Sequence, residues 1–410
     1  MPAEELLRTY AQVAIEVGLG VEPGDRVMIS APVQLPEFGR MLVEAAYDAG
    51  AVTADMLWFD DGVERARFTH GGDESASAIS GFSQFLRCSH DSGASGLRVL
   101  AEDPAALAGA DPQRVQRHRR VNGEYLHPVM QARGDLKVPW AVIGAPIPAW
   151  SRSVFGDLDP EEATERLWDA VLRACRIDTP DPIAAWRAHS QELNDRAAHL
   201  SSLPIRSVRY AGPGTDLVLG MTDHGTWKGG GVRTPAGKPF VPNIPTEEVF
   251  TSPHRMKAEG TVRASKPLSY FGELIEDFSF ELSEGRVVSW NAGHGGEVLE
   301  RVLDTDDGSV RFGEAAMVPM SGAVATEGLV WNNMLYDEND GCHIALGQSY
   351  ASCYEGSEDL GPDQRLEAGL NSSALHVDFV LGCRELDVFA VLDDGSETPI
   401  LIGGEWGFTV

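Results

Sequence analysis

The sequence predicts an α/β N-terminal domain with a mainly parallel sheet, followed by a β-rich α+β C-terminal domain. A chain of 410 residues is too long for one ordinary hydrophobic core, so two domains are expected. Helical patterns alternate with short apolar strands in the first half, whereas short strands and turns dominate from about residue 206. We therefore assign residues 1–200 to the first domain and residues 201–410 to the second.

The first half carries helices and strands in alternation. Apolar residues recur at helical spacing in residues 4–16, and Pro23-Gly24-Asp25 marks a turn before an apolar strand. Strands that alternate with helices favour a parallel sheet covered on both faces. The expected helices are residues 4–16, 37–48, 161–175 and 182–200, and the expected strands are residues 26–30, 54–59, 97–100 and 140–144.

The second half alternates apolar and polar residues over short stretches, which is the pattern of half-buried strands. Glycines concentrate between residues 212 and 237, where they indicate tight turns. We expect a mainly antiparallel sheet in this domain. Its expected strands are residues 208–210, 216–219, 261–262, 278–282 and 286–290.

The chain is strongly acidic, with 33 Lys and Arg against 62 Asp and Glu and a formal net charge of −29. This charge repels nucleic acid phosphates and anionic membranes, so we expect neither as a partner. No apolar run approaches the roughly 18 residues of a spanning helix. The five cysteines are scattered without Cys-x-x-Cys spacing, which favours a reducing compartment. Because the N-terminus also lacks an apolar signal segment, we expect a cytoplasmic protein.

An apolar strand near the C-terminus, residues 374–381, carries His376 and Asp378 two positions apart. Side chains two apart on a strand share a face, so this imidazole and carboxylate point one way while Val377 points the other. Such a strand is suited to present ligands to a cation. The alternative is an ordinary surface strand whose polar face meets water.

A second cluster, residues 337–343, favours the metal site. Here the acids Asp337, Glu338 and Asp340 are followed by His343, and the next residues are apolar. Two clusters of histidine and carboxylate in one half of the chain make a metal site the leading hypothesis.

Further acidic residues stand in unusual surroundings. Glu247 and Glu248 lie between two prolines and beside bulky apolar residues, and Glu314 is embedded in small and apolar residues. Structural roles are the alternative for each. A glutamate before alanines favours a helix start, and paired glutamates after Thr246 can cap a helix.

Four stretches of the chain match one known family in residue type, order and spacing. They are NIPTEEVFTSP (243–253), FGEAAMVP (312–319), LYDENDGCHIALGQSY (335–350) and HVDFVLG (376–382). In these stretches the chain resembles the aminopeptidase T and aminopeptidase S family of metallo-aminopeptidases, and weaker matches extend over nearly its full length. The resemblance implies an α/β N-terminal domain, a β-rich catalytic C-terminal domain and a homodimer with enclosed active sites.

The resemblance also implies an activity and a set of site residues. The activity is the release of single amino acids from peptides with a free N-terminus, and the cofactors are two divalent ions per chain, with zinc, cobalt or manganese as candidates. The implied metal ligands are Glu248, Glu314, Glu338, His343, His376 and Asp378. The implied catalytic residues are Glu314, Glu338 and Tyr350.

The chemistry of peptide hydrolysis explains why such residues are needed. Two divalent ions about 3.5–4 Å apart can share a bridging hydroxide and polarise the scissile carbonyl, and several carboxylates offset the repulsion between the ions. We expect Glu314 to bridge the ions because it lies between the other ligands in chain order. Tyr350 could ligate an ion or donate a hydrogen bond to the oxyanion. Glu338 could ligate an ion or act as the general base, and the sequence leaves both choices open.

A different enzyme class uses some of the same residues. His343, His376 and Asp378 alone form the two-histidine, one-carboxylate set of mononuclear non-haem iron enzymes, so a ring-cleaving dioxygenase is the alternative function. A single iron would not require Glu248 and Glu314. The preferred prediction is therefore a metallo-aminopeptidase that acts through a metal-bound hydroxide in a dinuclear site.

Overall fold

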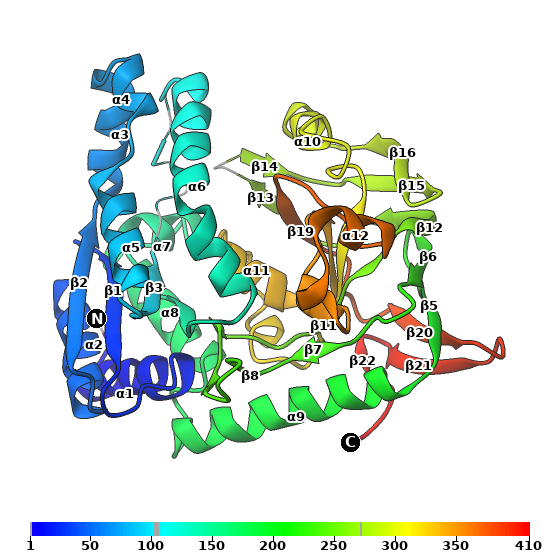
Figure 1. Cartoon of the computed structure of the whole chain (residues 1–410), viewed down its shortest axis with the longest axis horizontal. Helices are drawn as coiled ribbons and strands as arrows, with labels where there is room; N and C mark the ends of the chain where they lie inside the picture. Colours follow the sequence, from blue (N-terminus) through cyan, green and yellow to red (C-terminus); the bar gives the residue numbers. More distant parts are fainter. Residues whose placement is uncertain (1, 102, 104–105, 108, 271–272) are drawn as a thin grey trace. The chain divides into compact units, whose positions relative to one another are not determined.

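The computed structural model describes residues 2–101, 103, 106–107, 109–270 and 273–410, and Figure 1 labels its elements. The chain forms two compact units. Unit 1 takes in the chain up to Ala188 together with Gly231–Pro245, and unit 2 takes in His189–Gly230 and Thr246–Val410. The division into domains at residue 200 stays a prediction. Within the described residues, no helix is both long enough and apolar enough to cross a membrane.

Unit 1 contains a five-stranded parallel sheet in the order β10-β4-β3-β1-β2, which confirms the parallel sheet expected from the sequence. Six of the seven residues of β1 are buried, as expected for a strand covered on both faces. The edge strand β10 comes from the returning segment and was not predicted. The strands are β1 (Arg26–Pro32), β2 (Thr53–Phe59), β3 (Ser95–Leu100), β4 (Trp140–Gly144) and β10 (Asn243–Ile244).

The helix expected at residues 4–16 ends at Val13 and continues as a π-helical segment, Ala14–Gly18. Helices α3 to α7 were not predicted from the sequence. The longest of these, α6, is rich in polar residues and contains Pro128, so it lacks a clear apolar stripe. The helices of unit 1 are α1 (Glu4–Val13), α2 (Pro36–Asp48), α3 (Asp61–His70), α4 (Asp73–Ser77), α5 (Gly81–Asp91), α6 (Pro112–Gly134), α7 (Pro148–Val154) and α8 (Pro160–Ala174).

Helix α9 (Pro182–Ser202) begins in unit 1 and ends in unit 2. A short hairpin of β8 (Val232–Arg233) and β9 (Pro239–Phe240) belongs to unit 1.

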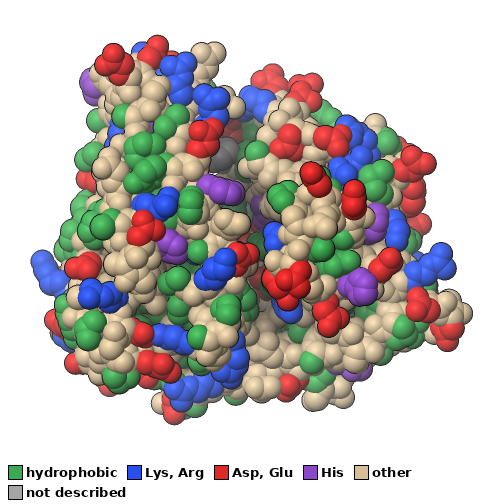
Figure 2. Space-filling view, viewed as in Figure 1, with side chains coloured by type: hydrophobic (Ala, Val, Ile, Leu, Met, Phe, Trp, Pro, Cys, Tyr) green, Lys and Arg blue, Asp and Glu red, His purple; other side chains and the backbone are tan. Residues whose placement is uncertain are grey.

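Charged side chains of both signs are interspersed on the face of the molecule seen in Figure 2, where acids form no single continuous patch.

Unit 2 contains two larger sheets, and the pairing in both is antiparallel, which confirms the mainly antiparallel pairing expected from the sequence. One has five strands in the order β19-β18-β17-β11-β7. These strands are β7 (Lys228–Gly229), β11 (Val249–Thr251), β17 (Phe312–Met317), β18 (His343–Gly347) and β19 (His376–Val380).

The other large sheet of unit 2 has eight strands in the order β16-β15-β12-β6-β5-β20-β21-β22. All five strands expected in the second half overlap strands of this sheet. Its strands are β5 (Ile205–Gly212), β6 (Thr215–Met221), β12 (Pro253–Arg263), β15 (Ser279–Ser283), β16 (Arg286–Asn291), β20 (Asp387–Leu392), β21 (Glu397–Ile402) and β22 (Glu405–Trp406).

The remaining elements of unit 2 are short. They are the pair β13 (Leu268–Tyr270) and β14 (Glu273–Ile275), the helices α10 (Gly296–Leu303), α11 (Met334–Asp337) and α12 (Pro362–Glu367), and the 3-10 turns Ala325–Glu327, Glu338–Asp340, Ala351–Cys353 and Ser357–Asp359.

One face of the five-stranded sheet belongs to the hydrophobic core of unit 2. Met317, Ile344, Leu346, Val377 and Phe379 alternate along β17, β18 and β19, and all five are buried in one cluster with residues of the eight-stranded sheet. The reverse face of these strands is therefore the face on which polar side chains can be presented.

Phe379 should be a major contributor to the stability of unit 2. Its ring lies 5.6, 5.3 and 5.9 Å from the rings of Phe278, Phe280 and Phe312. Replacing it with alanine leaves a cavity, so we expect Phe379→Ala to cost about 3–5 kcal/mol of unfolding free energy in a urea titration. Val288 is 57% exposed, and Val288→Ala should change the free energy by less than about 0.5 kcal/mol. Equal effects of the two substitutions would contradict this description of the core.

Candidate metal centre

The candidate ligands share the face of the five-stranded sheet that is turned away from the core. Glu314 on β17 pairs with Ala345 on β18, and Ala345 pairs with Asp378 on β19. Paired residues of antiparallel strands point to the same face, so Glu314 and Asp378 lie in one row on either side of a small side chain. His376 pairs with Gly347, and His343 pairs with Ala316, which adds further rows with small partners.

An irregularity at Gly313 places Glu314 on this face. Phe312 pairs with Leu346 and Glu314 pairs with Ala345, so β17 has one extra residue at this point, a β-bulge. Without the bulge, Phe312 and Glu314 would share a face because they are two positions apart. With it, the phenyl ring joins the core while the carboxylate joins the site.

Glu248 and Glu338 lie outside the paired strands of the five-stranded sheet. Glu248 immediately precedes β11, and its carboxylate lies 3.2 Å from Nε2 of His343. Glu338 begins the 3-10 turn Glu338–Asp340 after α11 and lies near Asp378 and Glu248. The helical alternatives for Glu314 and for the paired glutamates do not apply, because Glu314 lies within a strand and the pair precedes one.

The ligand atoms gather into two overlapping groups. Glu248, Glu314 and His343 each offer one atom within 4.8 Å of the other two, and so do Glu314, His376 and Asp378. Nε2 of His376 lies 2.9 Å from a carboxylate oxygen of Glu314 and 3.3 Å from one of Asp378. Glu314 therefore belongs to both groups. The structure brings together five of the six residues expected as ligands in this way, and places Glu338 nearby.

Both histidines turn the same nitrogen toward the acids. Nδ1 of His343 lies 3.2 Å from the carbonyl oxygen of Gly341, and Nδ1 of His376 lies 2.8 Å from that of Gln348. A carbonyl only accepts hydrogen bonds, so Nδ1 carries a proton and Nε2 faces the carboxylates. A histidine held in this way is oriented for metal ligation through Nε2.

Burial and crowding shift the pKa values of the site residues. Burial raises the pKa of Glu314 to about 7, and the nearby Asp378 and Glu248 add to the rise. Burial also raises the pKa of Glu338 well above its usual range, with further contributions from Asp378 and Glu248. Burial alone would lower the pKa of His343, but the hydrogen bond to Glu248 and the charges of the acids raise it to about 10. The acids thus repel one another strongly and attract positive charge.

The donor set fits divalent cations. If all four acids, Glu248, Glu314, Glu338 and Asp378, are ionised, even two protonated imidazoles leave an excess of negative charge. Oδ1 of Asp378 is buried, and Nε2 of His376, another candidate ligand atom, lies 3.3 Å from it. Carboxylate oxygens mixed with imidazole nitrogens suit zinc, cobalt and manganese.

Tyr350 lies at the edge of the group. Its hydroxyl lies 3.5 Å from Nε2 of His376, and the two rings are 5.0 Å apart. Phe250 pairs with Ala316 and so belongs to the same sheet face. Its ring lies 5.3 Å from the ring of Tyr350. Although 42% of Tyr350 is exposed, burial of its hydroxyl and the charge of Glu314 raise its pKa. An aromatic surface therefore adjoins the acids on this side.

Asn339, a fully buried residue that was not among the predicted site residues, connects two parts of the site. Oδ1 of Asn339 accepts a hydrogen bond of 2.7 Å from the backbone N–H of Glu247, and Nδ2 of Asn339 donates to Leu335 and, at 3.4 Å, to Glu338. An asparagine between two acids resembles an ordinary turn residue, so the sequence offered no signal for this role.

A family model described as thermophilic metalloprotease (M29) matches residues 3–406. The site, with its buried carboxylates and imidazoles, and this match define the class of protein as a metal-dependent hydrolase of peptide bonds. The chain belongs to the thermophilic metalloprotease family (M29).

Individual relatives match over nearly their full length. The chain is 39% identical to aminopeptidase T of Thermus thermophilus over 405 residues, which is 98% of each chain. It is 36% identical to aminopeptidase 2 of Geobacillus stearothermophilus over 406 residues, which is 99% of this chain and 98% of the relative. The structure matches that of wild-type AmpT from Thermus thermophilus with a TM-score of 0.92 at 38% identity, over 98% of this chain and 99% of that one.

These findings do not favour the alternative of a mononuclear iron dioxygenase. A mononuclear site would use His343, His376 and Asp378 and leave Glu248 and Glu314 without a role. The ligand atoms of both glutamates nevertheless lie within the two groups described above.

The adjacent pair Glu247 and Glu248 provides a matched test of the ligand assignment. Both are acidic and little exposed, but Glu248 faces His343, whereas Glu247 lies 3.6 Å from Nε2 of His189. Glu248→Gln should lower both bound metal and turnover by at least about tenfold, because a neutral amide would replace a charged candidate ligand. Glu247→Gln should be much milder. Metal analysis of both purified variants checks this, and equal losses would show that the wrong member of the pair has been assigned.

Proposed function

We propose that this chain releases single N-terminal amino acids from peptides at a site that holds two divalent ions. The chain is a metal-dependent aminopeptidase, which its family and the names of its relatives support. The observation that carries the dinuclear site is the position of Glu314, which belongs to both groups of ligand atoms. A carboxylate has two oxygens, so one residue can serve two ions.

The proposed ligands divide between the two ions. Glu248 and His343 would hold one ion, His376 and Asp378 the other, and Glu314 would bridge them. Zinc, cobalt and manganese are the candidate metals, because each accepts mixed oxygen and nitrogen ligands. Divalent cations at such a site supply Lewis acidity, which polarises a carbonyl group and lowers the pKa of water.

The residues around the ligands position the substrate and move protons. Glu338 lies among the carboxylates, where it is placed either to ligate an ion or to accept a proton from the attacking water and pass it to the leaving amine. Tyr350, with its hydroxyl beside His376, is placed to donate a hydrogen bond to the oxyanion that develops on the scissile carbonyl. The α-amino group of the substrate is drawn to the acidic surroundings and anchors the first peptide bond.

Two further properties belong to this proposal. The enzyme forms a homodimer, as its family resemblance implies, and works in the cytoplasm, as its scattered cysteines indicate. Light scattering coupled to size-exclusion chromatography tests the first property, because a dimer would have twice the 44.2 kDa mass of the chain.

Metal removal tests the proposed chemistry directly. Dialysis against a chelator should abolish hydrolysis of a leucyl amide substrate, and adding back cobalt, zinc or manganese should restore it, because the catalytic water depends on the ions. Titration of the metal-free protein should reach full activity near two ions per chain. Full activity in protein shown by elemental analysis to be metal-free would contradict the proposal. Activity that saturates at one ion per chain would contradict the dinuclear site.

A blocked substrate tests the exopeptidase assignment. Acetylation of the α-amino group removes the charge and lone pair by which the acidic site anchors the substrate. We therefore expect N-acetyl-leucyl substrates to react at least about a hundredfold more slowly than leucyl substrates with the same leaving group, since anchoring supplies orientation. Kinetics of the matched pair provide the measurement. Similar rates for both would exclude an aminopeptidase even if the metal dependence held.

A further inference from the structure

The two histidines of the site differ in what holds them. Nδ1 of His343 donates to the carbonyl of Gly341, two residues earlier in the chain, whereas Nδ1 of His376 donates to the carbonyl of Gln348, a residue 28 positions away. The direction of Nε2 of His376, which faces Glu314, therefore depends on where a distant main-chain carbonyl lies.

Asn371 holds both neighbours of Gln348. Its Nδ2 donates a hydrogen bond of 2.6 Å to the carbonyl of Gly347, its backbone N–H donates 2.9 Å to Oγ of Ser349, and its carbonyl accepts 3.1 Å from the backbone N–H of Ser349. Asn371 is only 2% exposed. One buried side chain and its backbone thus fix the main chain on either side of the carbonyl that orients His376.

Gly313 leaves the space in which that carbonyl lies. A Cβ at Gly313 would come within 2.4 Å of the carbonyl oxygen of Gln348 and 2.3 Å of that of Gly347. Both contacts are too short for any side chain. The bulge residue that turns Glu314 onto the site face is therefore also the residue that allows Gln348 to approach.

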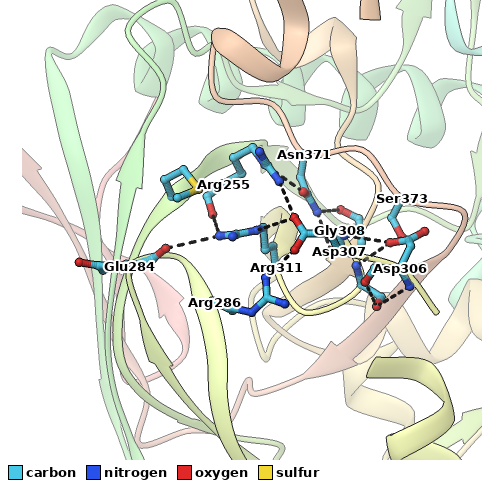
Figure 3. A network of polar contacts seen from close by, with 12 residues as sticks. Arg255, Glu284, Arg286, Asp306, Asp307, Gly308, Arg311, Asn371 and Ser373 are labelled. Carbon is cyan, nitrogen blue, oxygen red and sulfur yellow. Dashed lines mark hydrogen bonds and ion pairs between the residues drawn. The ribbon is translucent and has the colours of Figure 1, made fainter. Parts of the chain in front are cut away.

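A wider polar network holds Asn371 and the segment that leads to His376 (Figure 3). Asn371 also donates 2.8 Å to the carbonyl of Gly308 and accepts 3.4 Å from Nε of Arg255. Asp306 accepts hydrogen bonds from Oγ of Ser373 at 2.8 Å and from the backbone N–H of Ala374 at 2.7 Å. The chain is thus anchored on both sides of residue 372 before it enters β19.

We infer that Asn371 is a positioning residue that orients His376 for metal binding through the main-chain carbonyl of Gln348. This inference rests on the proposed role of His376 as a metal ligand. It assigns to Asn371 an effect on the affinity for metal beyond any effect on folding, because the imidazole can rotate once the carbonyl is released.

The test measures metal affinity and folding separately in Asn371→Ala. We expect about a 10- to 100-fold higher dissociation constant for zinc, measured in competition with a chromophoric chelator, and an altered visible spectrum of the cobalt-loaded protein. Asn291→Ala, at an exposed position on β16 in the same unit, should match the unsubstituted chain in both readouts. Thermal unfolding of the metal-free proteins reports the purely structural effect.

A milder variant covers the case in which Asn371→Ala does not fold. Ser349→Ala removes only the acceptor for the backbone N–H of Asn371, and should weaken zinc binding by about 2- to 10-fold. Zinc affinity and a cobalt spectrum unchanged in the folded Asn371 or Ser349 variant, whatever its melting temperature, would overturn the inference.

The variant His376→Ala separates this outcome from failure of the proposed function. Loss of metal in His376→Ala combined with unchanged metal affinity in Asn371→Ala would overturn the inference about Asn371 and leave the proposed function intact. Unchanged metal affinity and content in His376→Ala would remove the ligand role of His376, and the inference together with it.

Discussion

Repulsion among buried carboxylates is the constraint on which the arrangement of unit 2 depends. Glu314 is 3% exposed and lies beside other acids, so each ionised group raises the cost of ionising the next. The strands that carry Glu314 and Asp378 also bury Met317 and Phe379 on their other face. The acids therefore cannot separate without exposing apolar surface to water, and the core holds a group of like charges together until cations balance it.

The two faces of β17 depend on a single glycine. The bulge at Gly313 lets Phe312 enter the core and Glu314 enter the site, although the two residues are an even number of positions apart. The same glycine admits the carbonyl that holds His376. One position without a side chain thus sets the direction of the shared carboxylate and the approach of the support for the second histidine, which couples the two proposed ion sites through the backbone.

The side-chain faces of a regular strand could be predicted from the sequence. Irregularities of the main chain, such as a bulge or the position of one carbonyl group, could not. The face shared by His376 and Asp378 follows from the period of a strand, and the regular strand β19 confirms it. The same rule would place Phe312 and Glu314 together, because a bulge leaves no clear trace in residue type. The carbonyl of Gln348 has no side-chain signature at all. In unit 1, the strands followed from apolar runs, whereas α6 and the returning strand β10 lacked a pattern strong enough to be recognised.

The opposite faces of β19 make its core-facing positions far more sensitive to a change in chain length than to which apolar residue occupies them. Substituting Val377 with another apolar residue changes the packing locally. Deleting one residue between the anchored Ala374 and His376 would instead move imidazole and carboxylate onto the core side and turn Phe379 toward the acids. Insertions and deletions should therefore be excluded from this segment during divergence of the family, while exposed turns such as the one at Gly395 remain free to vary in length.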